Sequence, residues 1–329
     1  MSMQLDACET KILSDPATDL VVNVLSYERV LKRTLLFAVG AARCPPTHPL
    51  FKHGGGPQRC PYIDFMRSSV IRTIDKHGPA VLTPNCANFQ NIGSTYQRQM
   101  LDERGDFNDW IAVSPSLLAE LSADCASSSR AADGMFFEKA VAPITPVQYM
   151  AQRQIMDMLI NNVHVSDLAF DEYLVRLVQS VVSNADEYWQ KQIKRKSSPR
   201  PRCELHQRDV VEAVKERLAK EFWINHSLAD LAGDAHCSTS KLVRIFRIET
   251  GMSLHAYQQQ FRIRTSLQLL TDSPCDLTGI AAQLGFANHS HFSTVFRRLF
   301  GITPSKFRRD PSFGLVKQFV ETLPNCVAA

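Results

Sequence analysis

The sequence predicts an α+β protein, with a strand-rich N-terminal half followed by an all-helical C-terminal half. Between about residues 25 and 113, short apolar runs are separated by turn signals such as HGGGP, KHGP and NIG, a pattern typical of short β-strands. From residue 146 onward, apolar side chains recur every three or four positions, which indicates helices. Residues 227–257 and 276–307 repeat one helical pattern, so the C-terminal half holds two similar units.

The bulk composition indicates a globular chain of about two domains. The 329 residues are 44% hydrophobic and 21% charged, and no apolar run approaches the ~20 residues of a membrane helix. The N-terminal MSMQLDACETK carries acids where a secretory signal carries basic residues. The nine cysteines are odd in number and include no CxxC pair, which argues against a disulfide framework. We therefore expect a cytoplasmic protein without membrane contact.

The net charge of +4 is unevenly distributed along the chain. Acidic side chains outnumber Lys and Arg before residue 190, whereas residues 191–202 hold six basic side chains and no acid. Residues 208–310 are again net basic. A basic half joined to an acidic half suggests that the C-terminal half meets a polyanion.

Four regions follow from these patterns. Residues 1–190 are expected to form a sensor or dimerisation domain, with mostly antiparallel strands over about 25–113 and helices over about 146–190. The basic stretch QKQIKRKSSPRPR covers residues 190–202. Residues 191–207, which include nearly all of it, are expected to be an exposed linker. Residues 208–310 form the helical domain, and residues 311–329 a tail.

An apolar stripe in the helix expected over residues 167–190 is a candidate dimer contact. Packing of the same stripe on the strands is the alternative, because an apolar face does not say what covers it. The stripe residues proposed for dimerisation are Leu174, Leu177, Val178 and Val181.

Each copy of the duplicated pattern consists of a short helix, a turn, a longer helix and a glycine stop. Side chains suited to N-capping precede each helix, and a glycine suited to a left-handed C-terminal position follows each longer helix. The N-cap candidates are Ser227, Ser238, Asp276 and Asn288, and the glycines are Gly251 and Gly301.

Helical spacing gives each longer helix an apolar inward face and a polar or cationic outward face. The inward faces are Leu242, Ile245, Phe246 and Glu249 in the first copy and Phe292, Val295, Phe296 and Leu299 in the second. The outward faces are Ser240, Val243, Arg244 and Arg247, then Ser290, Ser293, Thr294 and Arg297. Such a helix fits the major groove of B-DNA, and two tethered copies can enter successive grooves roughly 34 Å apart. The expected tether is a helix over residues 253–270.

Residues 208–310 resemble the DNA-binding domain of the AraC/XylS family of transcription regulators. The match is carried by SLADLA, STSKLVRIFRIETG, FRIRTSLQLL, LTGIAAQLGF and SHFSTVFRRLFGITPSKFRR. The resemblance implies a seven-helix domain with two helix-turn-helix units, double-stranded DNA and RNA polymerase as partners, and neither a catalytic activity nor a cofactor. The positions implied to face bases are Ser240, Val243, Arg244, His289, Ser290 and Thr294, with flanking or phosphate contacts from Ser238, Lys241, Arg247, Ser293 and Arg297.

The N-terminal half resembles the same regulators only in PYIDFMRSSVIRT and RGDFNDWIAVS. This weaker resemblance implies a cupin-like small β-barrel with a helical pair, which senses a small-molecule effector, forms a homodimer and commonly activates transcription. A plain dimerisation scaffold is the alternative.

Cysteine and histidine positions raise two further hypotheses. Cys44, His48, His53 and Cys60 could supply zinc ligands, but their spacing lacks the tight pairs of a structural site, so we expect loop residues and no metal. A DNA-alkylation repair protein with the same DNA-binding domain would need a zinc-bound cysteine cluster, which the scattered cysteines do not supply. A ligand-binding scaffold with vestigial DNA binding is the third class, and the intact caps and glycine stops of both copies argue against it.

Overall fold

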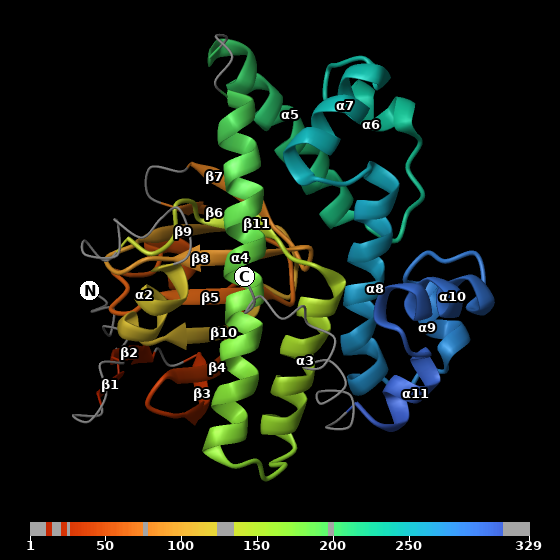
Figure 1. Cartoon of the computed structure of the whole chain (residues 1–329). Helices are drawn as coiled ribbons and strands as arrows, with labels where there is room; N and C mark the ends of the chain where they lie inside the picture. Colours follow the sequence, from red (N-terminus) through yellow and green to blue (C-terminus); the bar gives the residue numbers. More distant parts are fainter. Residues whose placement is uncertain are drawn as a thin grey trace, which may run out of the picture.

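The computed structural model of the chain describes residues 11–14, 21–24, 27–74, 78–123, 135–196 and 201–311. The strands are β1 Lys11–Ser14, β2 Val21–Val24, β3 Glu28–Arg33, β4 Phe37–Cys44, β5 Tyr62–Met66, β6 Val70–Ile74, β7 Pro79–Leu82, β8 Cys86–Gln90, β9 Tyr96–Met100, β10 Asp106–Val113 and β11 Val141–Pro143. The helices are α1 Leu50–His53, α2 Pro115–Ala123, α3 Pro146–Ile160, α4 Asp167–Lys196, α5 Pro201–Lys220, α6 Leu228–Asp234, α7 Thr239–Thr250, α8 Leu254–Asp272, α9 Leu277–Gln283, α10 His289–Phe300 and α11 Pro304–Arg309. Strands precede the long helices along the chain, so the α+β class is confirmed (Figure 1).

The strands form open antiparallel sheets. The largest has the order β11-β8-β5-β10-β4-β3, a second has the order β7-β6-β9, and β1 pairs with β2. The expectation of antiparallel strands is confirmed, but within the described residues the pairings do not close the expected cupin-like barrel. The reason lies at Arg67–Ser69, where the chain leaves the six-stranded sheet after β5 and starts the three-stranded sheet with β6.

The two faces of the six-stranded sheet have different neighbours. On one face Ile63, Phe65, Phe89 and Ile111 pack into the main apolar core with α3 and α4. Because strand side chains alternate between faces, Asp64 lies on the opposite face, towards the three-stranded sheet. There Arg72 of β6 donates to the Asp64 carboxylate at 2.8 Å. Helices therefore cover one face, and an ionic network the other.

This buried ionic network joins the two sheets. Arg72 also donates to Asp106, the first residue of β10, at 2.8 Å, and Arg98 of β9 donates to the same carboxylate at 2.6 Å. Arg98 further donates to the Tyr96 hydroxyl at 2.6 Å. All these side chains are almost completely buried. Removing one member would leave an uncompensated buried charge, which strongly destabilises a fold.

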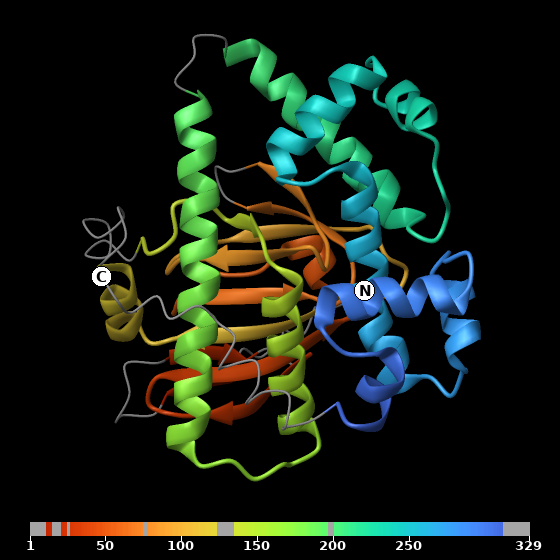
Figure 2. The same cartoon turned by 45° about the vertical axis from the view of Figure 1, so that its right-hand side comes forward.

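The helices α3 and α4 lie across the helix-covered face of the six-stranded sheet (Figure 2). The side chain of Thr145 and that of Gln148 form a reciprocal capping box at the start of α3, which satisfies two otherwise unpaired backbone donors. The long helix α4 packs against β11, where Trp189 donates from its indole nitrogen to the Val141 carbonyl at 2.9 Å.

The four residues proposed for dimerisation lie on this inward face of α4. Each of them is at most 1% exposed, and all belong to the main core: Leu174, Leu177, Val178 and Val181. The stripe thus packs on the sheet of its own chain, which is the alternative that the sequence left open. These side chains give a second copy no exposed surface to bind.

The basic segment expected to be an exposed linker is largely helical. Residues 191–196 continue α4 and residues 201–207 begin α5, while residues 197–200 lie outside the described part of the chain. The buried side chain of Gln192 donates to the Ile248 carbonyl at the end of α7 at 2.7 Å. Contact with α7 explains why α4 extends past residue 190.

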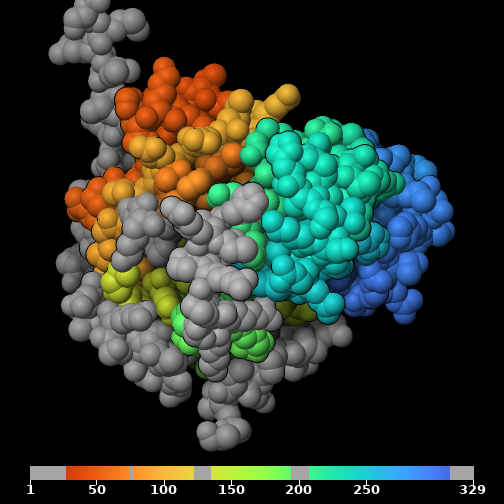
Figure 3. All heavy atoms as spheres, turned by 90° about the horizontal axis from the view of Figure 1, so that it is seen from above, coloured from red at the N-terminus to blue at the C-terminus, as the bar shows by residue number. Residues whose placement is uncertain are grey.

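Within the described residues, the C-terminal half consists of the seven helices α5 to α11 and lies against one side of the strand-rich half (Figures 1 and 3). The helices α5, α6 and α7 share a small core of their own. In contrast, Phe292 and Phe296 of α10 belong to the same apolar core as α3 and the six-stranded sheet. The two units of the C-terminal half are therefore anchored differently.

Polar contacts complete the junction between the halves. Arg264 of α8 is fully buried and donates to the carbonyls of Pro84 and Ile144, both at 2.7 Å. Asn85 donates to the Tyr257 carbonyl at 2.8 Å. Burial lowers the pKa of Arg264 to about 10, and the described residues place no carboxylate beside it. None of the described helices combines the length and the apolar character that a bilayer span requires.

Because of the buried ionic network, we expect the protein to lose stability in acid. Burial raises the pKa of Asp106, but Arg72 and Arg98 outweigh it and lower that pKa to about 2. The carboxyl therefore contributes stability that is present above the pKa of about 4 in the unfolded chain and is lost as the pH falls towards about 2. We expect the free energy of unfolding, measured with urea, to decrease over this range by on the order of 2 kcal/mol from this group.

Two variants test this assignment. Asp106→Asn should lose about 3–5 kcal/mol at neutral pH, because Arg72 and Arg98 stay buried without their shared carboxylate, and should show a shallower acid limb. Asp167→Asn, at a side chain that is 74% exposed, should match the parent protein. An equally steep acid limb in Asp106→Asn would contradict the assignment.

Candidate nucleic-acid interface

The first two-helix unit consists of α6 and α7, whose ends form as the sequence predicts. The Ser227 hydroxyl caps α6 by accepting from the backbone N–H of Asp230. The Ser238 hydroxyl caps α7 by accepting from the backbone N–H of Lys241. Gly251 ends α7 in the left-handed conformation, with φ 74°. Both capping predictions and the glycine stop are confirmed for this unit.

The two faces of α7 also follow the predicted division. Leu242, Ile245 and Phe246 are completely buried in the core of the first unit, while Glu249 at the edge of this face is partly exposed. The opposite face carries exposed side chains that are polar, cationic or short and apolar: Ser238, Ser240, Val243, Arg244 and Arg247, with Lys241 partly exposed beside them.

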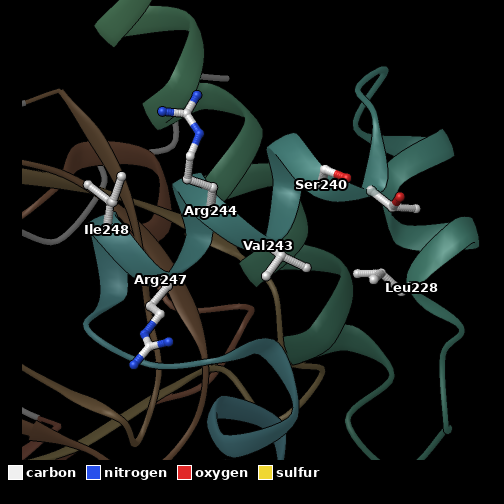
Figure 4. Close-up of a pocket in the computed structure, with 7 residues that line it drawn as sticks. Leu228, Ser240, Val243, Arg244, Arg247 and Ile248 are labelled. Carbon is white, nitrogen blue, oxygen red and sulfur yellow. The ribbon is translucent and has the colours of Figure 1, made fainter.

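The exposed face of α7 borders a hollow of about 660 Å³ (Figure 4). Arg244 and Arg247 extend from opposite sides of the helix, and Val243 lies between them and Leu228 of α6. Within the described part of the chain, neither guanidinium group has an ion-pair or hydrogen-bond partner. The face therefore presents two uncompensated cations around an apolar centre.

The second unit, α9 and α10, repeats the construction. The Asp276 carboxylate caps α9 by accepting from Gly279 N–H, and the Asn288 side-chain oxygen caps α10 by accepting from His291 N–H. Gly301 ends α10 with φ 74°. These three predictions are confirmed as well.

On α10 the buried face consists of Phe292, Val295 and Phe296, with Leu299 partly buried. Ser290, Thr294 and Arg297 are exposed, while His289 and Ser293 are partly exposed. The His289 ring nitrogen Nε2 and the Ser293 hydroxyl form a hydrogen bond of 3.2 Å. The His289 and Ser293 side chains are therefore hydrogen-bonded to each other. Thr294 and Arg297 are the exposed side chains of this face that lie beyond that pair.

The relative position of the two units depends on Arg262 of α8, a role that sequence spacing does not reveal. Its guanidinium donates to the carbonyls of Phe222 at 2.6 Å and Ile224 at 3.0 Å and to the side chain of Asn225 at 2.9 Å, all in the connection between α5 and α6. It also donates to the Gly285 carbonyl at 2.9 Å, in the turn between α9 and α10. One side chain therefore joins both helix-turn-helix units.

Gly285 lies where this junction is tightest. Its φ is +73°, and a Cβ at this position would lie 1.9 Å from the Trp223 carbonyl oxygen. The neighbouring Phe286 packs its ring under Arg262, with 5.9 Å between the guanidinium carbon and the ring centroid. The pair Gly285–Phe286 is part of the motif that carries the family resemblance, so a sequence signal for this contact exists.

Three of the four residues considered as zinc ligands pack against other side chains of the fold. Cys44 and Cys60 are completely buried, and burial raises the pKa of both thiols, to about 11 and about 12. The His48 ring packs edge-on against Tyr27. The described residues contain no group of three or more His, Cys, Asp or Glu side chains that could hold a metal ion.

Comparison with known proteins identifies the C-terminal region. Residues 231–310 match a family model described as a helix-turn-helix domain. The chain is 32% identical over 100 residues to the Msm operon regulatory protein of Streptococcus mutans, covering 30% of this chain and 36% of that protein. It is 42% identical over 72 residues to the HTH-type transcriptional activator RhaR of Salmonella arizonae, covering 22% of this chain and 26% of that protein. The AraC/XylS resemblance of the helix-turn-helix domain is confirmed.

These matches span about a third or less of the length of the curated relatives. Among solved structures, ToxT from Vibrio cholerae covers 76% of this chain and 90% of that chain, with 16% identity and a TM-score of 0.31.

Alanine substitutions at Gly285 and Gly301 test whether the contact between Gly285 and the Trp223 carbonyl is close. Gly301 has nearly the same φ, but a Cβ there would meet nothing within 4 Å. Gly301→Ala is therefore expected to cost about 1–2 kcal/mol of unfolding free energy for the left-handed conformation alone. Gly285→Ala should cost about 1–3 kcal/mol more, because the Trp223 carbonyl must move. Urea unfolding of both variants measures the difference, and equal losses would mean that the contact with Trp223 is not tight.

Proposed function

We propose that this chain, whose C-terminal region carries an AraC-type helix-turn-helix domain, is a sequence-specific DNA-binding transcription regulator. In this proposal α7 and α10 enter two successive major grooves on one side of the duplex. The observation that carries the proposal is the pair of exposed faces, one on each helix, to which the described residues supply no carboxylate partner and which are held by α8 and Arg262.

The dimensions of α8 support binding to neighbouring grooves. Its 19 residues extend over about 28 Å at the rise of an α-helix. Successive major grooves on one side of B-DNA lie roughly 34 Å apart. The two units pack at different levels along α8 in Figure 1, so a separation of this order is compatible with simultaneous binding.

The residue roles follow from exposure on each helix. Ser240, Val243 and Arg244 are proposed to contact bases in the first groove, with Val243 offering only an apolar contact such as a thymine methyl. In the second groove His289, Ser290 and Thr294 are proposed to face bases. Phosphate or flanking contacts are assigned to the remaining outward side chains: Ser238, Lys241, Arg247, Ser293 and Arg297.

For the N-terminal half we propose a sensing role that is coupled to DNA binding through the buried junction at Arg264. The protein would then act in the cytoplasm as a non-enzymatic regulator that contacts RNA polymerase. Activation is the proposed direction of regulation, in line with the activator RhaR among its relatives. If a homodimer forms, it must use a surface other than the buried α4 stripe.

The role of Arg244 gives the main test of the proposal. Arg244→Ala should weaken binding of the full chain to a duplex selected from random sequences by about 1–3 kcal/mol, and should relax the preference at one base pair. Arg104→Ala changes an exposed arginine of the N-terminal half and should leave binding unchanged. Equal weakening by Arg244→Ala on every duplex would assign Arg244 to phosphate instead. If the parent chain prefers no duplex over its shuffled counterpart, the proposed function is wrong.

Arg297 provides a contrasting prediction. As a phosphate contact it should contribute to binding of all duplexes alike, because phosphates carry no base information. Arg297→Ala should weaken binding uniformly and reduce the slope of log affinity against log salt by about one. Fluorescence anisotropy over a salt series measures this slope. A loss confined to one base pair, with an unchanged slope, would contradict the phosphate role.

A further inference from the structure

The outward face of the first helix-turn-helix unit has an apolar centre made by two helices. Leu228, the first residue of α6, is 39% exposed, and Val243 of α7 is 43% exposed. Both side chains line the hollow of about 660 Å³ at this face. They point towards one another in Figure 4. An apolar pair of this kind loses its contact with water when another molecule fills the hollow.

The second unit carries different side chains at the equivalent positions. The first residue of α9 is Leu277, which is partly buried against the main apolar core. The fifth residue of α10 is Ser293, where α7 has Val243, and Ser293 forms a hydrogen bond of 3.2 Å with His289. The described residues of α9 and α10 expose no large apolar side chain. The helix-turn-helix fold of the second unit thus forms without an exposed apolar pair, so the fold alone does not require the pair of the first unit.

Polar and cationic groups surround the apolar pair. Arg244 and Arg247 extend from opposite sides of α7, where they suit phosphates or the acceptors of guanine. Thr239 and Ser240 line the same hollow. Because a hydroxyl group both donates and accepts, it pairs equally with the carbonyl oxygen of thymine and the amino group of cytosine. The hydroxyls therefore do not by themselves distinguish these two bases.

The base edges of the major groove offer one apolar partner for such a pair. Of the groups that distinguish the four base pairs there, the C5-methyl group of thymine is the apolar one. Cytosine and uracil carry only a hydrogen atom at C5, so each leaves the space of a methyl group unfilled. A methyl group against Leu228 and Val243 removes apolar surface from water on both molecules, which favours binding.

We propose that Leu228 and Val243 form a receptor for the C5-methyl group of a pyrimidine in the first major groove. Leu228 is then a specificity-determining residue contributed by α6, beside those of α7. Because the methyl group itself is recognised, 5-methylcytosine at this position is bound in the same way as thymine, and cytosine is not. The affinity of the protein for a site with cytosine here therefore depends on methylation of that base. This inference rests on the proposed function, in which α7 enters the major groove.

Base replacement tests the inference with the purified full chain and a duplex selected from random sequences. In the half-site that holds the base pair assigned to Arg244, each thymine is replaced in turn by uracil, which removes only the methyl group. We expect one replacement to weaken binding by about three- to fivefold, the effect of about one buried methyl group. Replacement of thymines outside both half-sites is the control and should leave binding unchanged. Equal binding of thymine and uracil throughout the half-site overturns the proposal.

Cytosine methylation gives the second arm of the experiment. At the position that responds to uracil, cytosine should bind more weakly than thymine, and 5-methylcytosine should bind about three- to fivefold more tightly than cytosine. Fluorescence anisotropy on the four duplexes, with thymine, uracil, cytosine and 5-methylcytosine at this position, measures both ratios. A methylated cytosine that binds no better than cytosine contradicts recognition of the methyl group.

Side-chain variants locate the receptor. Leu228→Ala and Val243→Ala should each bring the ratio of thymine to uracil affinity below about twofold, because the methyl group then lacks an apolar partner. Leu168→Ala is the control, since this leucine of α4 is 81% exposed and lies outside the helix-turn-helix units, and it should keep the ratio of the parent protein. The parent ratio in both Leu228→Ala and Val243→Ala overturns the assignment of the receptor.

The two proposals fail in different ways. A parent chain that prefers its selected duplex to a shuffled one, but binds thymine and uracil equally, contradicts only the methyl receptor. A parent chain that prefers no duplex contradicts the proposed function, and the methyl receptor with it.

Discussion

Arg262 joins the two helix-turn-helix units through one guanidinium group, and the geometry of the candidate DNA interface depends on it. A helix such as α8 sets the distance between the units but leaves their rotation about its axis to other contacts. Arg262 restricts that rotation by donating to Phe222, Ile224 and Asn225 on one side and to Gly285 on the other. A lysine has no planar fork of donors and could not reproduce this set of bonds. The close approach of Gly285 to the Trp223 carbonyl is the steric counterpart of the same junction.

The two units differ in how they are attached to the strand-rich half. The second unit shares a continuous apolar core with α3, through Phe292 and Phe296. The first unit has its own core, and α7 meets α4 through hydrogen bonds at carbonyls: Tyr188 donates to the Glu249 carbonyl and Gln192 to the Ile248 carbonyl. Water can replace such bonds at small net cost, whereas exposing an apolar core cannot be compensated in that way. Next to the first unit, Ala219 of α5 packs with Val81 of β7 and Phe261 of α8 in a small apolar cluster, so the first unit has the smaller apolar attachment to the strand-rich half.

Local features of this protein were predictable from the sequence, and contacts between distant segments were not. Caps such as Ser238 and Asn288, glycine stops such as Gly301, and the buried faces of α7 and α10 depend on neighbouring residues, so spacing predicts them. The buried arginines Arg72, Arg262 and Arg264 were missed, because arginine is usually exposed and its acceptors lie far away in the sequence. The same reason applies to the open sheets, the inward-facing stripe of α4 and the helical continuation through the basic segment. Each of them depends on which element packs opposite, so the structure reveals it and the sequence does not.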